Sequence, residues 1–578
     1  MRKLSGLLPH WIGAYPKGKL GADLTAGLIV TVLVIPQSLA YALLAGLPPQ
    51  MGLYVAIFPV IAYSLLGSSM VQAVGPVAIT AIMTFSVLSP IAAPGSPEYL
   101  LLAAALALLS GGMLLACGLL RLGFLSQMLS RPVISGFISG SAVLIVFSQT
   151  RHLLGLPKGD VHDLAQLGEL AQQILHSPTA AIGLLALAAL IVCRSWLKGW
   201  LESTGLSSGK AAFIVRLMPL VVVLLGTLAV IYWNLDRERG VKVVGSIVEG
   251  LPGFTFFVPE MSTIKSLLMP AFVMTLIGMV QGISMAQALA IKRRERIDAN
   301  AELVGLGGAN IVAAFYGGMP VGAGLSRSAV NVSAGAQTPL ASIVAALAMI
   351  AVVAGAAHWF ERLPLAVLAA SIIVAAFSMI DIKALRQAWA YDRADGLAYL
   401  GTAGGVLLFG IEAGIGLGVL LSTATLLFRA STPHIAVLGR IAGSEHFRNI
   451  ARHQVETIPG ALFIRIDERL FFGNLSAIEL RLNLELEHIE QPRDVVFVMS
   501  AVNLMDATAA DVFNELNQDL LERGIRLHLA EVKGPIQDRL MRTAFWKSLS
   551  GKVFLSANEA FEALLVPSEN VQRRSIKP

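Results

Sequence analysis

Between two apolar runs of the chain lies the stretch Gly317-Gly318-Met319-Pro320-Val321-Gly322-Ala323-Gly324-Leu325-Ser326-Arg327-Ser328-Ala329-Val330-Asn331. Its glycine and proline residues disfavour a continuous helix up to Gly324, whereas residues 326–336 can start one. The pattern therefore predicts unwound backbone that leads into a half helix. At membrane depth, such a break is tolerated only where it is buried in protein or lines a water-filled cavity.

Polar side chains at the start of this half helix favour an anion. The first turn of a helix presents N–H groups without partners and the positive end of the helix dipole. Ser326, Arg327 and Ser328 add two hydroxyl groups and a fixed positive charge. The alternative is plain helix packing, because Gly and Ser are common where transmembrane helices meet and a lone Arg can snorkel. We favour binding because Arg327 lies between the apolar runs 311–316 and 343–353, too deep for a helix-end anchor.

Composition places the chain in a membrane. Of its 578 residues, 55% are hydrophobic and 14% charged, and the mean hydropathy is +0.71. These values exclude an ordinary soluble globular protein. Apolar spans dominate to about residue 428, and the remainder has the mixed composition of a soluble domain. The net charge of +6 is explained by basic cytoplasmic loops, so we expect the lipid bilayer as the surroundings and no nucleic acid as a partner.

The residue types needed for metal binding or catalysis are not arranged for it. Cys117 and Cys193 are the only cysteines, and both lie in apolar helical segments. The sequence contains no paired carboxylates, metal-spaced His and Cys residues, or nucleophile elbow. We therefore expect no metal, no cofactor and no enzymatic activity.

Span-length apolar segments predict about fourteen membrane crossings. We place them near residues 22–45, 50–67, 98–120, 128–150, 178–194, 211–233, 264–290, 340–358, 363–379, 384–409 and 411–428, with short or broken ones near 70–90, 299–316 and 321–338. Lysines and arginines gather in the N-terminal segment and in alternate loops, which predicts cytoplasmic N- and C-termini in the cell inner membrane. The expected divisions are a cytoplasmic segment 1–20, a transport domain 21–430, a linker 431–457, a soluble domain 458–566 and a tail 567–578.

Two more broken segments carry polar residues. In the first span, Gln37 and Tyr41 follow Pro36 and share one helix face, which fits either a binding site or a kinked helix with bonded polar groups. In the second, residues 71–74 look extended, and Gly75-Pro76 is expected to start a helix with proline in its first turn. Two half helices in corresponding positions of two halves are typical of an inverted-repeat transporter with a midplane site.

The chain resembles the SulP anion transporters, the sulfate permease family. The likeness lies in Pro36 to Tyr41 with the following Leu47-Pro48-Pro49-Gln50-Met51-Gly52-Leu53-Tyr54, and in the segment from Ala309-Asn310 through Ser326-Arg327-Ser328 to Ala334-Gly335-Ala336. The resemblance implies a seven-plus-seven inverted repeat, a core and a gate domain that slide past each other, and a homodimer. It also implies an anion between the third and tenth helices, with help from the first. On this sequence, the corresponding positions are Gln37, Tyr41, Gly75, Pro76, Val77, Ala78, Ser326, Arg327 and Ser328.

One position departs from the family. Many relatives have a carboxylate, associated with cation or proton coupling, where this chain has Gln281. Gln281 cannot titrate, so the coupling position either hydrogen-bonds beside the site or is part of the helix core. Glu302, Glu361 and Glu412 all look close to span ends, which argues against proton coupling.

The C-terminal part alternates strand and helix patterns. Strands are expected at 462–466, 495–499, 525–529 and 553–555, and helices at 475–487, 507–521 and 536–547, which predicts an α/β layer fold. The run from Asp494 to Ala509, followed by Gly524-Ile525-Arg526-Leu527 and Val532-Lys533-Gly534-Pro535, resembles a STAS domain. Soluble relatives of that module are phosphorylated on a serine where this chain has Ala507. The resemblance therefore implies scaffolding, dimer support or regulation without that phosphoswitch.

Three functions remain open from the sequence. The first is a secondary anion transporter with elevator-like alternating access, the second an anion channel or uncoupled uniporter on the same fold, and the third a membrane signalling scaffold that works through its STAS-like tail. The polar residues in both broken helices favour the first two. One Arg, two serines and backbone donors suit sulfate, bicarbonate, a dicarboxylate or a halide equally.

Overall fold

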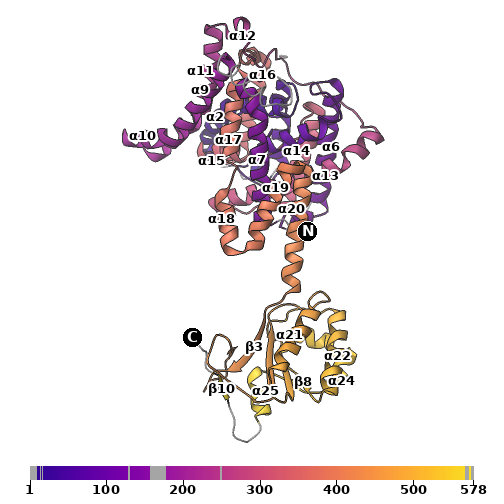
Figure 1. Cartoon of the computed structure of the whole chain (residues 1–578). Helices are drawn as coiled ribbons and strands as arrows, with labels where there is room; N and C mark the ends of the chain where they lie inside the picture. Colours follow the sequence, from indigo (N-terminus) through magenta and orange to yellow (C-terminus); the bar gives the residue numbers. More distant parts are fainter. Residues whose placement is uncertain are drawn as a thin grey trace, which may run out of the picture. The chain divides into compact units, whose positions relative to one another are not determined.

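The computed structural model describes residues 10–13, 15, 17–127, 130–156, 177–247, 250–565 and 572–574. The chain divides into two compact units, Met1–Ser422 and Thr423–Pro578, which are described separately (Figure 1).

The first unit is helical. Its elements are α1 (His10–Gly13), η1 (Lys17–Lys19), α2 (Leu20–Leu44), α3 (Pro49–Tyr54), α4 (Phe58–Leu66), β1 (Val74–Gly75), α5 (Ala78–Leu88), α6 (Pro97–Leu119), η2 (Leu122–Gln127), α7 (Arg131–Leu154), α9 (Pro178–Val192), η3 (Cys193–Leu197), α10 (Lys198–Ser203), α11 (Ser208–Tyr232), α12 (Leu235–Glu238), α13 (Met261–Arg293), α14 (Ala299–Tyr316), β2 (Gly322–Ala323), α15 (Leu325–Ser333), α16 (Leu340–Gly355), η4 (Ala357–Phe360), α17 (Leu365–Phe377), α18 (Ile382–Tyr391), α19 (Arg393–Phe409) and α20 (Ile411–Ser431), the last of which runs into the second unit.

The helices confirm a polytopic membrane protein. Within the described residues, eight helical segments are long and apolar enough to cross a membrane, and three shorter apolar helices accompany them. The number of fourteen crossings stays a prediction. Two expected spans are divided: 50–67 forms α3 and α4, and 384–409 forms α18 and α19. The second division arises because the side chain of Asp392 accepts a hydrogen bond from the Ala394 N–H at 2.9 Å and starts a new helix.

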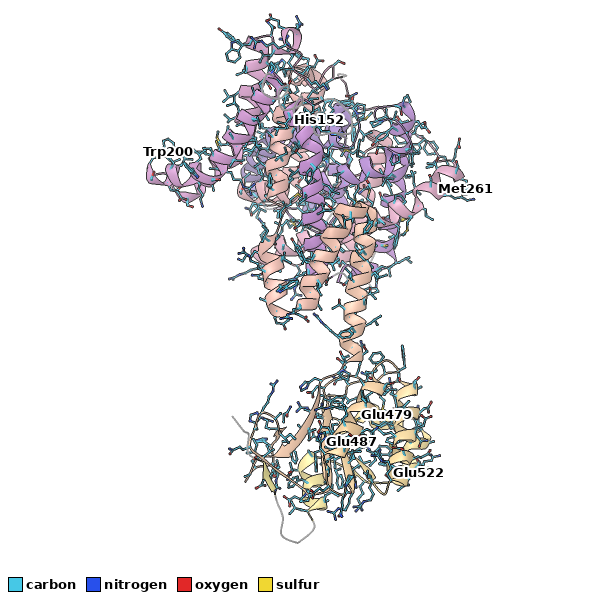
Figure 2. All side chains as sticks on the ribbon, viewed as in Figure 1. His152, Trp200, Met261, Glu479, Glu487 and Glu522 are labelled. Atoms are coloured by element: carbon cyan, nitrogen blue, oxygen red, sulfur yellow. The ribbon has the colours of Figure 1, made fainter. Side chains whose placement is uncertain are left out.

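The helices pack in two groups. In the first group, α14 packs on α6 and α4, and α16 packs on α2; in the second, α7 packs on α17 and α19, and α9 on α17 and α11. Small residues allow the close contact of α14 with α6, since a Cβ on Gly307 would lie 2.5 Å from the Leu115 nitrogen. Large apolar side chains point outward from both groups. Figure 2 shows Trp200 and Met261, 62% and 66% exposed, at two such places, as expected of a lipid-facing surface.

Two short strands pair with each other in the first group. β1 pairs with β2 in antiparallel register, Val74 opposite Ala323 and Gly75 opposite Gly322, and a helix follows each strand. The predicted half helices are confirmed as α5 and α15. The prediction that Pro76 lies in the first turn of α5 is wrong, because α5 begins at Ala78 after an extended Val77 (φ −133°, ψ 153°). The strand pairing keeps the backbone extended past Gly75, so the helix starts later.

The second unit is an α/β domain. Its strands are β3 (Ile435–Arg440), β4 (Phe447–Asn449), β5 (Val455–Thr457), β6 (Ala461–Ile466), β7 (Asp494–Val498), β8 (Arg526–Ala530), β9 (Val553–Phe554) and β10 (Gln572–Arg574), and its helices are α21 (Leu475–Glu487), α22 (Ala507–Glu522), α23 (Gly534–Leu540), α24 (Ala544–Ser548) and α25 (Ala557–Leu564). The described strands form one sheet in the order β10-β5-β3-β6-β7-β8-β9, with β4 beside β3. Strands β6 to β9 are parallel, whereas β3 is antiparallel to β6.

Alternation along the strands gives the domain two cores. Ile464 and Phe497 belong to the core under α21, α22 and α24, whereas Phe463 and Val496 belong to the core that includes Phe561 of α25. Successive side chains of a strand point to opposite faces, so one sheet is covered on both sides. The layer fold expected from the sequence is confirmed.

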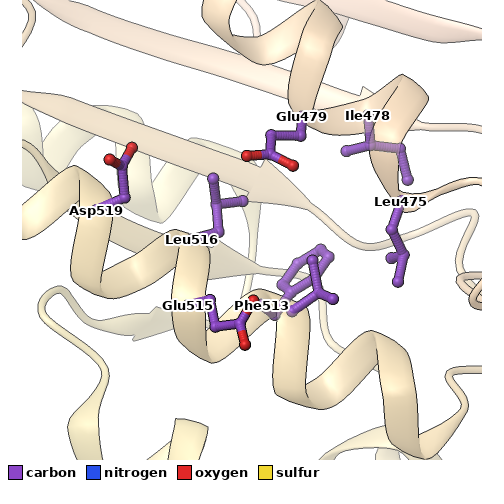
Figure 3. Close-up of a pocket in the computed structure, with 8 residues that line it drawn as sticks. Leu475, Ile478, Glu479, Phe513, Glu515, Leu516 and Asp519 are labelled. Atoms are coloured by element: carbon purple, nitrogen blue, oxygen red, sulfur yellow. The ribbon is translucent and has the colours of Figure 1, made fainter.

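Some boundaries in this domain differ from expectation. Residues 431–457, expected as a linker, contain β3, β4 and β5, because Ala436 and Leu438 alternate toward the core and β3 pairs with β6. The helix expected over 536–547 is divided into α23 and α24. A hollow of about 160 Å³ lies between α21 and α22, where Figure 3 shows Glu479, Glu515 and Asp519 around apolar side chains such as Phe513 and Leu516.

Candidate functional site

The starts of α5 and α15 form the centre of the candidate site. The first hydrogen bonds inside these helices run from the Ala81 N–H to the Val77 oxygen (3.0 Å) and from the Ser328 N–H to the Gly324 oxygen (2.8 Å). The preceding N–H groups of each first turn have no partner within the helix. Val77 has no polar side-chain atom and Gly324 has no side chain, so neither N-cap residue can cap its helix. Two positive helix ends are therefore held close together by the β1–β2 pair.

Arg327 links the two broken segments. Its Nη1 donates to the Val74 carbonyl and its Nη2 to the Pro76 carbonyl, both at 3.1 Å, and only 6% of the residue is exposed. Among the described residues, its buried Nε–H has no partner. Gly75 makes this contact possible, since a Cβ there would lie 1.8 Å from Nη1 and its φ is +153°. The guanidinium group thus satisfies the unwound backbone of β1 and keeps its Nε–H free.

Ser328 completes the connection between the strands. Its hydroxyl oxygen accepts from the Ala73 N–H at 2.9 Å, and the Ala73 carbonyl accepts from the Gly324 N–H at 3.0 Å. Ser328 is fully buried. The side chain of Ser326 lies outside the described residues. Of the predicted polar residues on α15, Arg327 and Ser328 are therefore both bound to the backbone that leads into α5.

Two asparagines support the same backbone and were given no role from the sequence. Asn310 of α14 forms a paired contact with Val321, donating to its carbonyl (3.0 Å) and accepting from its N–H (2.9 Å). Asn331 of α15 donates to the Val71 carbonyl at 3.0 Å. The only sequence signal is an Asn within an apolar helix, which usually marks a hydrogen bond between segments.

Helix α2 lies beside both half helices. Its predicted site residues Gln37 and Tyr41 are half-buried, and Tyr41 is close enough to Arg327 for an electrostatic interaction. The structure therefore brings Tyr41 close to Arg327. It places Gln37 one turn away on the same helix.

Gln281 of α13 reaches the site from another side. Its Nε2 donates to the Ala323 carbonyl of β2 at 3.3 Å. It also lines a small apolar cavity of about 30 Å³, together with Ile79 of α5, Phe137 of α7 and Ile415 of α20. The second helix group therefore contacts the first turn of α5 through apolar side chains. The cavity has room for two or three waters at most, by the rough measure that one water needs about 10–15 Å³.

The prediction that Glu302 lies near the end of a span describes its position in the helix but not its burial. Glu302 does lie in the first turn of α14, but it is completely buried. Asp23, in the first turn of α2, is completely buried as well. Sequence reasoning missed both burials, because a charge near a helix start normally indicates contact with water.

The soluble domain has no hydroxyl at the position of the missing phosphoswitch. Asp506 caps α22 by accepting from the Ala509 N–H at 2.7 Å, and Ala507 follows as an exposed residue. At the other end of the sheet, Asp494 binds Arg526 (2.9 Å) and His528 (3.1 Å). Burial raises the pKa of Asp494, but these two partners lower it more, so its pKa lies below the ordinary value.

Known proteins resemble the chain over nearly its whole length. The sulfate permease family profile matches residues 20–402, and the STAS domain profile matches residues 452–560. A probable sulfate transporter of Mycobacterium tuberculosis is 33% identical over 559 residues, covering 95% of this chain and 96% of that protein. The chloroplastic sulfate transporter 4.1 of Arabidopsis thaliana is 32% identical over 590 residues, covering 98% of this chain and 84% of that protein.

Solved structures share the fold. The murine anion transporter Slc26a9, in its inward-facing state, matches with a TM-score of 0.84 at 20% identity, covering 97% of this chain and 94% of that one. The transmembrane domain of a cyanobacterium bicarbonate transporter, BicA, matches with a TM-score of 0.58 at 24% identity, covering 69% and 98%. These identities speak for the fold alone. On the two profiles and the full-length relatives, the chain belongs to the sulfate permease family, with a helical membrane domain followed by a STAS domain.

Proposed function

We propose that the protein is a secondary transporter of a small anion, with sulfate as the first candidate. The observation that carries this proposal is the β1–β2 pair, which holds the uncapped starts of α5 and α15 together beside Arg327. N–H groups and a helix dipole at one point favour a negative charge. The relatives named sulfate transporters are similar over 95% and 98% of this chain, which supports sulfate ahead of a dicarboxylate, bicarbonate or a halide.

We assign the anion-binding groups by their position where the starts of α5 and α15 meet. Backbone N–H groups of the segment Gly75, Pro76, Val77 and Ala78 and of Ser326 contribute donors, with the exception of proline, which has none. Arg327 contributes its charge and its free Nε–H, and Ser328 its hydroxyl proton. Gln37 and Tyr41 cover the site from α2.

Transport follows from movement between the two helix groups in an elevator-like cycle. The first group carries the site, and α7 of the second group faces the first turn of α5 through Phe137, which lines the small apolar cavity together with Ile79 and with Ile415 of α20. Apolar contacts of this kind hold few hydrogen bonds that would resist sliding. We further propose that the protein is a homodimer in the cell inner membrane with both termini in the cytoplasm, and that residues 21–430 form the transport domain.

Uptake of labelled anions into liposomes containing the purified full chain tests the proposal. Sulfate, fumarate, bicarbonate and chloride are compared in wild type, Arg327→Lys and Arg362→Lys. We expect saturable uptake of sulfate and a loss of at least about ten-fold in Arg327→Lys, because one ammonium group cannot replace the planar fork between two carbonyls. Arg362, which pairs with Asp236 at 3.2 Å, is the matched control and should keep wild-type uptake.

The alternative function, an anion channel or uncoupled uniporter, has one observation in its favour, since Gln281 carries no titratable proton at the family's coupling position. Exchange separates the two: a transporter preloaded with unlabelled sulfate accelerates entry of labelled sulfate, whereas a channel passes a current that does not saturate. Absence of saturable uptake for all four anions would refute the proposed transporter.

A further inference from the structure

Glu302 is the most heavily hydrogen-bonded carboxylate of the membrane domain as described. Its Oε1 accepts from the Ser68 N–H (2.9 Å), the Ser68 hydroxyl (2.7 Å) and the Ser69 N–H (2.7 Å). Its Oε2 accepts from the Tyr63 hydroxyl (2.6 Å) and from Nε2 of Gln72 (3.3 Å). The residue is 0% exposed. The carboxylate thus binds three residues of the segment that leads from α4 to β1.

All five donors are neutral. The helices packed against α14 carry other titratable groups: Tyr63 on α4, the half-buried Cys117 on α6, the exposed Arg121 before η2, and Arg293 at the end of α13, which is bound to Glu295. Asp298 caps α14 by accepting from the Asn300 N–H, and it is exposed to solvent. Among the described residues, none of these cations pairs with Glu302. Burial disfavours the charged form of a carboxylate, and none of these cations offsets that cost here. Binding a proton would therefore relieve it.

Gln72 can bind Glu302 in either protonation state. At present its amide nitrogen donates to the carboxylate, and its Oε1 is buried with no partner among the described residues. A half-turn of the amide exchanges the two atoms, and Oε1 then accepts the proton of a carboxylic acid. Because Oε1 has no bond to lose, the rotation breaks only contacts of the amide nitrogen, with Glu302 and with the neighbouring Tyr63 hydroxyl. The other buried carboxylate, Asp23, has four donors, from Tyr15, Gln337 and Thr338, and no such amide acceptor.

The same segment continues into the anion site. Gln72 is followed directly by Ala73, whose N–H binds Ser328 and whose carbonyl binds the Gly324 N–H. A change in the amide of Gln72 therefore occurs next to the bonds that join β1 to the start of α15. This is a contiguous path between a titratable group and the anion site.

We propose that Glu302 and Gln72 form a proton-binding site, through which a proton enters with the anion although Gln281 cannot titrate. The proposal rests on the anion transport proposed above. The proton binds to Oε2 of Glu302, the carboxylate becomes a neutral carboxylic acid, and the proton leaves on the other side of the membrane. No other group changes its charge in this step.

Two assays on liposomes containing the full chain separate the proton site from transport itself. Sulfate exchange at equal pH on both sides measures transport, and sulfate accumulation under an inward proton gradient, with the membrane voltage clamped at zero, measures coupling. For one proton per anion, a gradient of one pH unit raises the accumulation ratio about ten-fold. We expect this gain in wild type, and in Glu302→Gln we expect exchange within about three-fold of wild type with no gain from the gradient.

Asp23→Asn is the matched control, because it also neutralises a fully buried carboxylate in the first turn of a helix, and it should keep the ten-fold gain. A gain that persists in Glu302→Gln would overturn the proposal. So would wild-type exchange without any gain from the gradient, which leaves anion transport intact. Wild type that neither exchanges nor accumulates any anion would refute the transport function as well. Should Glu302→Gln fail to fold, Gln72→Leu decides: loss of the gain supports the site, and a retained gain overturns it.

Discussion

Replacing Gly75 with alanine tests whether the contact between Arg327 and β1 is essential. The new Cβ would lie 1.8 Å from Nη1, so the guanidinium group has to leave the carbonyls of Val74 and Pro76. Each hydrogen bond to a charged group contributes about 1.5–3 kcal/mol. The backbone at φ +153° adds a cost of about 1–3 kcal/mol for any residue with a side chain. Even the lower limits together, about 4 kcal/mol, correspond to nearly three factors of ten.

The assay is initial sulfate uptake into liposomes, with thermal stability followed by size-exclusion chromatography. We expect Gly75→Ala to lose more than about 100-fold in uptake. Gly322→Ala is the control, since Gly322 lies directly opposite in the strand pair. Its Cβ would meet only the methyl groups of Val77 and Thr80, at 3.0 and 3.3 Å, so a small shift costing about 1 kcal/mol suffices and uptake should fall less than ten-fold. A folded Gly75→Ala protein with wild-type uptake would refute the reasoning.

Three further changes probe other contacts. Asn310→Ala removes both bonds to Val321 and leaves a buried N–H and carbonyl unpaired, so we expect about 2–3 kcal/mol lower stability and reduced sulfate uptake, whereas unchanged melting would contradict this. Gln281→Glu places a carboxylate beside the Ala323 carbonyl and an apolar cavity, so uptake should fall at neutral pH and recover in acid, and a flat pH profile would speak against it. Asp494→Asn weakens the bonds to Arg526 and His528 and should cost about 1–2 kcal/mol at pH 7, measured by hydrogen exchange of β7 in the full chain. Because the pKa of Asp494 is depressed in the folded state, its contribution is present above the unfolded value of about 3.9 and is lost as the pH falls below it, so the difference between variant and wild type should vanish in strong acid.

The half helices and most of the sheet could be predicted from local chemistry. The clustered glycine and proline residues at 75–76 and 318–324 favour a break in the helix, and the short apolar runs at 462–466 and 495–499 alternate with helical stretches as in an α/β layer fold. The pairing of β1 with β2 could not be predicted, because each strand has only two residues and its partner lies far away in the sequence. β3 is as long as β6 but was missed because it lies in a stretch that was interpreted as a polar linker, and its pairing with β6 makes it part of the sheet.

The environment of single side chains was predicted less well. Arg327 was expected to supply a fixed positive charge for the anion, and no sequence pattern indicated that two of its nitrogens bind the carbonyls of β1. The burial of Glu302 depends on the segment from Ser68 to Gln72 folding over the start of α14, which no local pattern indicates. Such contacts join residues more than 200 positions apart.

The way in which the unwound backbone is satisfied limits what the site can recognise. Carbonyl groups around β1 and β2 accept from the side chains of Arg327, Asn310, Asn331 and Gln281, so these donors are already in use, whereas Ser328 accepts from the Ala73 N–H. What is left for an anion is the first-turn N–H groups of α5 and α15, the Nε–H of Arg327, the hydroxyl proton of Ser328 and the positive charge itself. A charge acts without strict geometry, whereas a planar fork selects one partner shape. We therefore expect discrimination between sulfate, carboxylates and halides to depend on the size of the space between the helix ends and on covering groups such as Tyr41, more than on Arg327.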